Sequence, residues 1–216
     1  MNKPAEWIDR LRKLHTPVIA DVLDKLGFRN QCMNPLLRPL FPTARLAGFA
    51  LTVQTSPASV INPAHPYAGE LTAVDALKEN DVMVVSECEF SFWGELLSTS
   101  ARFRGSSGIV IDGYTRDSQA ITQLQFPVFC RGCHPADSLG RLEVVAHNVP
   151  IHCGGVFMAA GDLILADSDG IVVVPNSYAE QALALAEEKI RGENLVRAAL
   201  EQGMSTTEAF ATFGIL

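Results

Sequence analysis

The stretch DVMVVSE at residues 81–87 begins the most regular part of the sequence, and GIVIDG (108–113) and PVFCRG (127–132) follow it. Each is a short apolar run bounded by polar or turn residues, which is typical of a strand buried on both faces. The segments between them, GELLSTSARFRG (94–105) and TRDSQAITQLQ (115–125), have helical patterns. Strand, helix, strand, helix, strand with short links predicts parallel strands joined by right-handed crossovers.

The segments before and after this unit extend it. TPVIADVLDKLG (16–27) predicts an amphipathic helix with Thr16 as its N-cap. ARLAGFALTVQT (44–55) and RLEVVAHNV (141–149) predict strands. DLILAD and GIVVVP, within 162–175, predict two antiparallel strands joined by a DSDG turn. Calcium loops have similar spacing, but the twelve-residue pattern with a final Glu is missing, which favours the turn.

The C-terminal part of the chain is helical in pattern. Residues 177–203 predict one long helix that is weakened at Gly192, and Ser205 with Glu208 forms a capping box for a short last helix. We therefore expect one three-layer mixed α/β domain over residues 1–216, with a helical extension from about residue 177.

Composition excludes several classes of protein. The chain has 216 residues, 48% of them apolar, with 17 basic and 24 acidic side chains, hence a net charge of −7. This balance argues against nucleic-acid binding, because no basic face is available to displace counterions. No apolar run approaches the roughly 18 residues of a membrane span. The first fifteen residues lack the apolar core of a signal peptide, so we expect a cytoplasmic protein without a membrane segment.

The cysteines include one motif that matches a haem-attachment pattern, and we interpret this match as chance. The five cysteines are Cys32, Cys88, Cys130, Cys133 and Cys153, an odd number that favours free thiols. CRGCH (130–134) matches the haem-attachment pattern, but attachment needs export, and the segment lies at a predicted strand end. A zinc site with His152 and Cys153 is the better alternative. Adjacent strand residues face opposite sides, however, so free thiols and a loop histidine are favoured.

The two strand-to-helix junctions carry the chemistry that remains. Dinucleotide-binding, phosphate-loop, zinc-protease and nucleophile-elbow signatures are absent. The first junction contains Gly94, Glu95, Leu96 and Leu97, and the second contains Arg116-Asp117. Because ligands of such sheets gather beyond the carboxyl ends of the strands, these residues are expected to converge at one rim.

The residue types at the two junctions suit a small carboxylate beside a metal ion. The amides of Leu96 and Leu97 at a helix N-terminus can bind an anion, and Arg116 adds a cationic fork. Asp117 and Glu95 supply hard oxygens for Mg²⁺ or Mn²⁺. This combination suggests a chelating 2-oxo acid. The alternative is that Arg116 and Asp117 form an ordinary surface ion pair at a helix start.

The stretch GELLSTSARFRGSSGIVIDGYTRDSQAI (94–121) resembles the signature of the RraA-like family, in which an acidic residue is followed, after twenty residues, by Arg-Asp. The resemblance continues through residues 127–137, 148–175, 205–216 and the early 16–27. The family includes class II 4-hydroxy-4-methyl-2-oxoglutarate aldolases and the regulator of ribonuclease E activity. It implies a three-layer β/β/α swivelling-domain fold, with mixed parallel and antiparallel sheets, assembled as a homotrimer or hexamer.

The resemblance also implies roles for the site residues. Asp117 would hold the metal, and Glu95 would reach it through water. Arg116 would bind the 2-oxo group and stabilise the enolate, while the amides of Leu96 and Leu97 would hold the pyruvyl carboxylate.

One further match and two departures concern the neighbouring subunit and the substrate. Glu193 matches a family glutamate that the neighbouring subunit supplies to the site. The family often has Asp at the position of Glu95, which affects the water shell of the metal. Its Asp-Asn-Leu segment with a following His is replaced by Gly69-Glu70-Leu71, which we expect to shape the substrate entrance.

These observations predict a divalent-metal-dependent lyase. It would cleave 4-hydroxy-2-oxo dicarboxylates of the 4-hydroxy-4-methyl-2-oxoglutarate type to pyruvate by a retro-aldol reaction. Oxaloacetate decarboxylation is expected too, because both reactions pass through the pyruvate enolate. A metal-linked water or Glu193 would take the 4-hydroxyl proton. The alternative prediction is a non-catalytic regulator that binds ribonuclease E.

Overall fold

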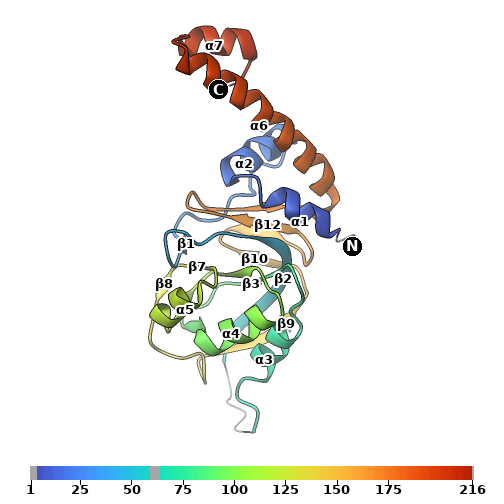
Figure 1. The fold of residues 1–216 in the computed structure, drawn as a ribbon. Coiled ribbons are helices and arrows are strands. Elements are labelled where there is room, and N and C mark those ends of the chain that lie inside the picture. Colours follow the sequence, from blue (N-terminus) through green and yellow to red (C-terminus); the bar gives the residue numbers. More distant parts are fainter. Residues whose placement is uncertain (1–3, 59–63, 216) are drawn as a thin grey trace.

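The computed structural model describes residues 4–58 and 64–215, which form a mixed α/β fold around a curled eight-stranded sheet (Figure 1). The strands run in the order β1-β7-β5-β3-β2-β12-β13, and β9 also pairs with β2. Their bounds are β1 Arg38–Pro39, β7 Val128–Cys130, β5 Gly108–Ile111, β3 Asp81–Val85, β2 Leu46–Pro57, β12 Leu163–Ala166, β13 Ile171–Val174 and β9 Leu142–His147.

The predicted parallel unit is confirmed. Strands β2, β3, β5 and β7 lie side by side in that order, and each of the pairs β2–β3, β3–β5 and β5–β7 is parallel. The crossovers contain α3 (Ala68–Asp75), α4 (Glu95–Phe103) and α5 (Ser118–Leu124). On the other side of β2, β12 and β13 form the predicted antiparallel hairpin, and β9 pairs antiparallel with β2 as well.

Side chains along β2 alternate between the two faces of the sheet, and each face has its own apolar core. Phe49 packs with helices α1 (Ala5–Leu11), α2 (Thr16–Lys25) and α6 (Ala179–Glu201), while Leu51 and Val53 pack with α3, α4 and α5. These three side chains are on one face because they are two residues apart, and successive strand residues point to opposite sides. Leu46 and Ala50 belong to the opposite face and to a separate apolar cluster.

That second face is closed by a small hairpin, β10 (Ile151–Cys153) with β11 (Val156–Met158), and by the irregular segment 29–43. Helices, central sheet and hairpin layer together give the expected three-layer β/β/α arrangement.

The C-terminal helices form an arm that leaves the body of the molecule. A short 3-10 turn, Asn176–Tyr178, leads into α6, which continues unbroken through Gly192 and is followed by α7 (Thr206–Phe213). The capping box of Ser205 and Glu208 is present. Figure 1 shows α7 at the end of α6 that is far from the sheet; we call α6 and α7 the C-terminal arm.

A three-stranded parallel sheet, in the order β4-β6-β8, was not predicted. Its strands are β4 (Ser91–Trp93), β6 (Tyr114–Thr115) and β8 (Gly132–Cys133). They follow β3, β5 and β7 along the chain, so the small sheet extends each parallel strand toward the rim. Strands of two or three residues are too short to show a periodicity in sequence.

Two local predictions are wrong. Thr16 is not the N-cap of α2: the cap is His15, and the amide and Oγ1 of Thr16 both donate to Asp167, at 2.9 and 2.6 Å. Helix α5 begins at Ser118 and not at residue 115, because Tyr114 and Thr115 pair in β6.

Candidate active site

The small sheet brings the two strand-to-helix junctions side by side. Gly94 and Glu95 connect β4 to α4, and Arg116 and Asp117 connect β6 to α5. The amide of Arg116 donates to the carbonyl of Trp93 at 2.9 Å, which fixes one junction against the other. The predicted convergence of Glu95, Arg116 and Asp117 at one rim is therefore present in the backbone of the fold.

Gly94 allows Asp117 to approach α4. A Cβ atom at Gly94 would lie 2.7 Å from Oδ2 of Asp117 and 3.4 Å from Nε of Arg116. In its absence, the amide of Glu95 donates to Oδ2 of Asp117 at 3.1 Å. The carboxylate of Asp117 thus occupies the space that any side chain at position 94 would take.

Asp117 itself has a left-handed backbone, with φ of 58° and ψ of 31°. Few residues other than glycine adopt this conformation, and such strain gathers at functional sites. Its side chain is 47% exposed and does not cap its own helix α5. Within the described part of the chain, its contacts are the Glu95 amide and the Arg116 guanidinium at 3.9 Å, which leaves the carboxylate open to a ligand.

The carboxylates at this rim that could bind a metal ion are those of Asp117 and Glu95. Oε1 of Glu95 accepts from Oγ1 of Thr99 at 2.8 Å, so this side chain stays on its own helix. Among the described residues there is no group of three His, Cys, Asp or Glu side chains arranged to hold a metal. Mg²⁺ commonly keeps several waters and uses only one or two protein carboxylates, and Asp117 with Glu95 fits that mode of binding.

Arg116 and the start of α4 form the cationic side of the site. Nη1 of Arg116 lies 3.3 Å from Oδ1 of Asp137, and its Nε lies 3.9 Å from Oδ2 of Asp117. The amides of Leu96 and Leu97 have no acceptor among the described residues, as expected in the first turn of a helix. These donors surround a position suited to a small anion.

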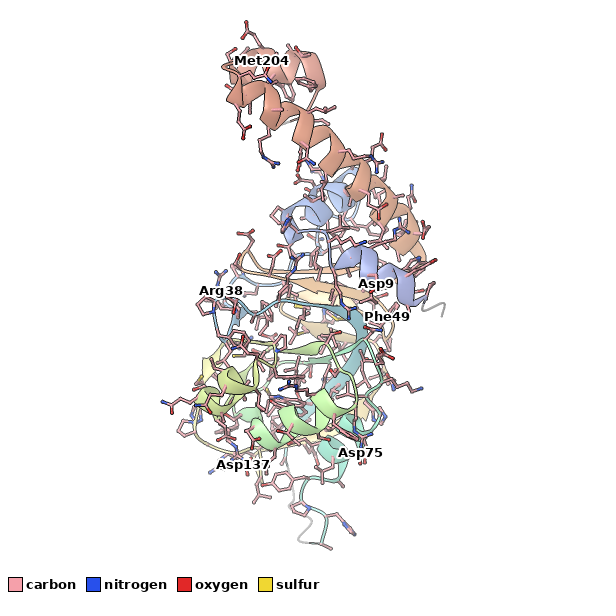
Figure 2. All side chains as sticks on the ribbon, viewed as in Figure 1. Asp9, Arg38, Phe49, Asp75, Asp137 and Met204 are labelled. Atoms are coloured by element: carbon pink, nitrogen blue, oxygen red, sulfur yellow. The ribbon has the colours of Figure 1, made fainter. Side chains whose placement is uncertain are left out.

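A cavity of about 320 Å³ lies at these residues. Arg116 is the one cationic side chain among its described lining residues, and the acidic ones are Glu70, Asp117 and Asp137. Trp93 and Leu97 contribute apolar surface. The sequence had indicated the entrance segment that contains Glu70, but not Asp137, which no motif distinguishes. Figure 2 places Asp137 at the end of the molecule far from Met204 on the C-terminal arm.

Glu70 and Asp137 are both acidic but differ in environment. Burial raises the pKa of Glu70 to about 7, against the opposing hydrogen bond from Oγ of Ser138 to its Oε2 at 3.0 Å. Burial also acts to raise the pKa of Asp137, but the hydrogen bond from Tyr67 and the charge of Arg116 outweigh it and lower that pKa. One cavity therefore holds a firmly ionised carboxylate and one that titrates near neutrality.

Glu193 is not near this cavity within one chain. It lies on α6, where Nζ of Lys189 contacts its Oε1 at 2.8 Å and Oδ2 of Asp21 at 3.2 Å. Helix α6 packs on α1 and α2, away from α4 and α5 (Figure 1).

The cysteine motif lies across the sheet from its proposed zinc partners. Cys130 is buried with α3, α4 and α5, whereas Cys153 is buried in the cluster on the opposite face. Cys133 and His152 are exposed, and Nδ1 of His134 accepts from the amide of Ala136. These side chains do not converge on one point.

Comparisons with known proteins agree on one family. The profile of the RraA-like family, described as Aldolase/RraA, matches residues 16–173. A relative from Halalkalibacterium halodurans, named "Putative 4-hydroxy-4-methyl-2-oxoglutarate aldolase", is 31% identical over 208 residues, which are 95% of this chain and 93% of the relative.

Two crystal structures have the same fold. An uncharacterised protein from Pseudomonas syringae is 26% identical with a TM-score of 0.88, covering 99% of this chain and 96% of the other. Streptomyces coelicolor RraAS2, described as an unusual member of the RNase ES inhibitor RraA protein family, is 27% identical with a TM-score of 0.83, covering 91% and 99%. None of the described helices is both long and apolar enough to cross a membrane.

Proposed function

Because the chain belongs to the RraA-like family, we propose that it is a carbon–carbon lyase that cleaves 4-hydroxy-2-oxo dicarboxylates of the 4-hydroxy-4-methyl-2-oxoglutarate type. The products are pyruvate and a second oxo acid. The observation that carries this proposal is the cavity that combines Arg116, the α4 amides and Asp117. The name of the relative from H. halodurans supports the same reaction class.

The substrate is held by its pyruvyl end. The free amides of Leu96 and Leu97 bind the carboxylate, with help from the positive end of the α4 dipole. The guanidinium of Arg116 donates to the 2-oxo oxygen. When the C3–C4 bond breaks, negative charge moves onto this oxygen, so the same donor stabilises the enolate more strongly than the substrate.

A divalent ion, Mg²⁺ or Mn²⁺, completes the proposal. Asp117 would hold it directly or through water, and Glu95 would do so through water. When bound, it supplies Lewis acidity toward the 2-oxo group. Gly94 keeps the carboxylate of Asp117 beside α4, and Asp137 orients Arg116 from the other side.

Oxaloacetate decarboxylation follows from the same arrangement. Loss of CO₂ from oxaloacetate leaves the pyruvate enolate that retro-aldol cleavage produces. The groups that bind the carboxylate and stabilise the enolate therefore serve both reactions, and only the retro-aldol cleavage needs a base for a hydroxyl proton.

A second copy of the chain is part of the proposal. Glu193 would reach the cavity only as a residue of a neighbouring copy in a trimer or hexamer, because its helix packs on α1 and α2 within one chain. Light scattering tests the assembly: a monomer at micromolar concentration removes Glu193 from the site.

The proposal is tested by a screen of 4-hydroxy-2-oxo acids and oxaloacetate with coupled detection of pyruvate. We expect Mg²⁺-dependent turnover that EDTA abolishes and added metal restores. Turnover unchanged in excess EDTA contradicts the metal role.

The alternative function is a regulator of ribonuclease E. The similar Streptomyces structure favours it, because that protein is described as a member of an RNase ES inhibitor family. In that case the screen detects no lyase activity, and the purified chain binds and inhibits the ribonuclease.

A further inference from the structure

Glu70 lies in the wall of the cavity that contains Arg116 and Asp117. We infer that Glu70 of the same chain is the base that takes the 4-hydroxyl proton of the substrate. This inference rests on the proposed lyase function and adds to it a catalytic residue that comes from neither the metal nor a neighbouring subunit.

The backbone fixes Glu70 at this place. Gly69, next to it in the first turn of α3, lies so close to β9 that a Cβ atom would be 2.7 Å from the carbonyl oxygen of Val144 and 2.9 Å from its Cβ. Ser138 then donates to Oε2 of Glu70 at 3.0 Å. The start of α3 is thus held on one side by a tight backbone approach and on the other by a hydrogen bond to the carboxyl group itself.

The surroundings of Glu70 suit proton transfer. Partial burial disfavours its charged form, and its pKa of about 7 leaves both forms available near neutral pH. The negative charge of Asp137 acts in the same direction, and the positive charge of Arg116 opposes it. Among the described residues, the charged and titratable groups around it are Asp137 and Arg116 in the cavity, His65 and Tyr67 before α3, Glu143 on β9 and the buried thiol of Cys88.

Other carboxylates at the site are committed to different contacts. Asp137 accepts from Tyr67 and from the amide of Ser138 and pairs with Arg116, which keeps it ionised and weakly basic. Asp117 accepts from the Glu95 amide and is the proposed metal ligand. Among the described residues, the Glu70 side chain accepts a single hydrogen bond, from the Ser138 hydroxyl to Oε2, so its other oxygen can accept the proton of a substrate hydroxyl.

The step balances without a further reactant. Ionised Glu70 takes the proton of the 4-hydroxyl, and the C4–O bond becomes a carbonyl. The C3–C4 bond breaks, and its electron pair forms the enolate whose oxygen Arg116 stabilises. C3 then takes a proton from water, and Glu70 returns its proton to the solvent. Cleavage of oxaloacetate releases CO₂ without any hydroxyl proton, so it does not need Glu70.

The difference between the two reactions gives the test. Glu70→Gln keeps the size and hydrogen-bonding capacity of the side chain but cannot accept a proton. We expect retro-aldol cleavage of 4-hydroxy-4-methyl-2-oxoglutarate to fall about 100-fold or more. Loss of oxaloacetate, followed directly with the same protein, keeps most of its rate. Glu70→Asp recovers part of the retro-aldol rate, and the matched control Glu89→Gln, an exposed glutamate outside the cavity, changes neither.

The pH profile adds a second reading. In the wild type, the retro-aldol rate rises as pH passes through about 7, where Glu70 loses its proton. This limb is absent from Glu70→Gln.

Three results overturn the inference: equal loss of both reactions in Glu70→Gln, which shows a structural role; wild-type rates for both; or the selective loss appearing in Glu193→Gln instead. A wild-type protein that converts neither substrate refutes the proposed function itself, which is a separate outcome.

Discussion

Two arginine–aspartate pairs follow the parallel strands, and they differ in how completely the protein satisfies them. In the first pair, Asp112 comes directly after β5, and its side chain is 8% exposed. Its Oδ1 accepts from Arg131 at 2.8 Å and its Oδ2 from the amide of Gly154 at 2.9 Å. Arg131 also contacts Glu87 at 3.0 Å.

The second pair, Arg116 with Asp117, follows β6 a few residues later. Its carboxylate is 47% exposed and accepts one backbone amide, and its guanidinium lines a cavity. The two pairs have the same residue types and similar places in the fold. The carboxylate of the first pair is buried and both of its oxygens accept hydrogen bonds, so this pair connects strands. The carboxylate of the second pair is exposed and has fewer hydrogen bonds, so it can still bind a ligand. The expected effects of mutation therefore separate into stability for one pair and activity for the other.

The largest effect on folding is expected for Arg131→Ala. It removes the cation from a buried carboxylate, and an uncompensated buried charge typically costs about 3–5 kcal/mol. We expect a strongly lowered Tm and denaturant midpoint. The double variant Arg131→Ala with Asp112→Asn should recover part of the loss, because the charge is then removed as well. If the stability of Arg131→Ala were unchanged, the pair of Arg131 and Asp112 would contribute no more to folding than the pair of Arg116 and Asp117.

The largest effect on activity is expected for Arg116→Ala. By analogy with other donors to a developing oxyanion, its removal raises the barrier by about 2.7–4 kcal/mol, or 10²–10³-fold in rate. The Arg116 side chain is 38% exposed, and its partners Asp117 and Asp137 are 47% and 26% exposed, so solvent screens both ion pairs and the free energy of unfolding should change by only about 1 kcal/mol. Arg116→Lys should restore little, because a point charge lacks the fork geometry. Wild-type turnover in Arg116→Ala would mean that Arg116 and Asp117 form only a surface ion pair in the wild-type protein.

A smaller effect on stability, combined with a large one on activity, is expected for Asp117→Gly. Glycine adopts the left-handed conformation freely, which offsets the loss of the hydrogen bond to the Glu95 amide. Stability should therefore stay within about 1 kcal/mol of the wild type. Activity should be lost through weaker metal binding, with partial recovery at raised Mg²⁺ or Mn²⁺. A clear drop in Tm would show that the carboxylate serves the fold more than the site.

Sequence could predict the parallel strands and the convergence at the rim, because β3, β5 and β7 are continuous apolar runs whose ends must meet at one edge. It could not predict β4, β6 and β8, whose two or three residues carry no periodicity. Nor could it predict that Asp112 is buried and hydrogen-bonded, because its partners Gly154 and Arg131 are distant along the chain.

The acidic side of the cavity could not be predicted from the sequence for a similar reason. Asp137 comes to Arg116 through tertiary packing, and the unusual pKa of Glu70 arises from burial that no local pattern reports. The role of Glu193 stays a prediction that depends on a second copy of the chain.

The smallest expected effect concerns stability and pH at Glu70. Its pKa of about 7 lies above the ordinary value of 4.5, so the folded protein binds the proton more tightly than the unfolded chain does. The resulting stabilisation is complete below pH 4.5 and is lost as pH rises through about 7, where a partly buried charge remains. Glutamine carries no charge at any pH. We therefore expect the Tm of Glu70→Gln relative to the wild type to be higher at pH 8 than at pH 5, while Glu89→Gln shows no such change. A Tm difference independent of pH would mean that Glu70 is ionised as easily as the exposed glutamates, and that the open pair at Arg116 lacks a neighbour able to exchange protons at neutral pH.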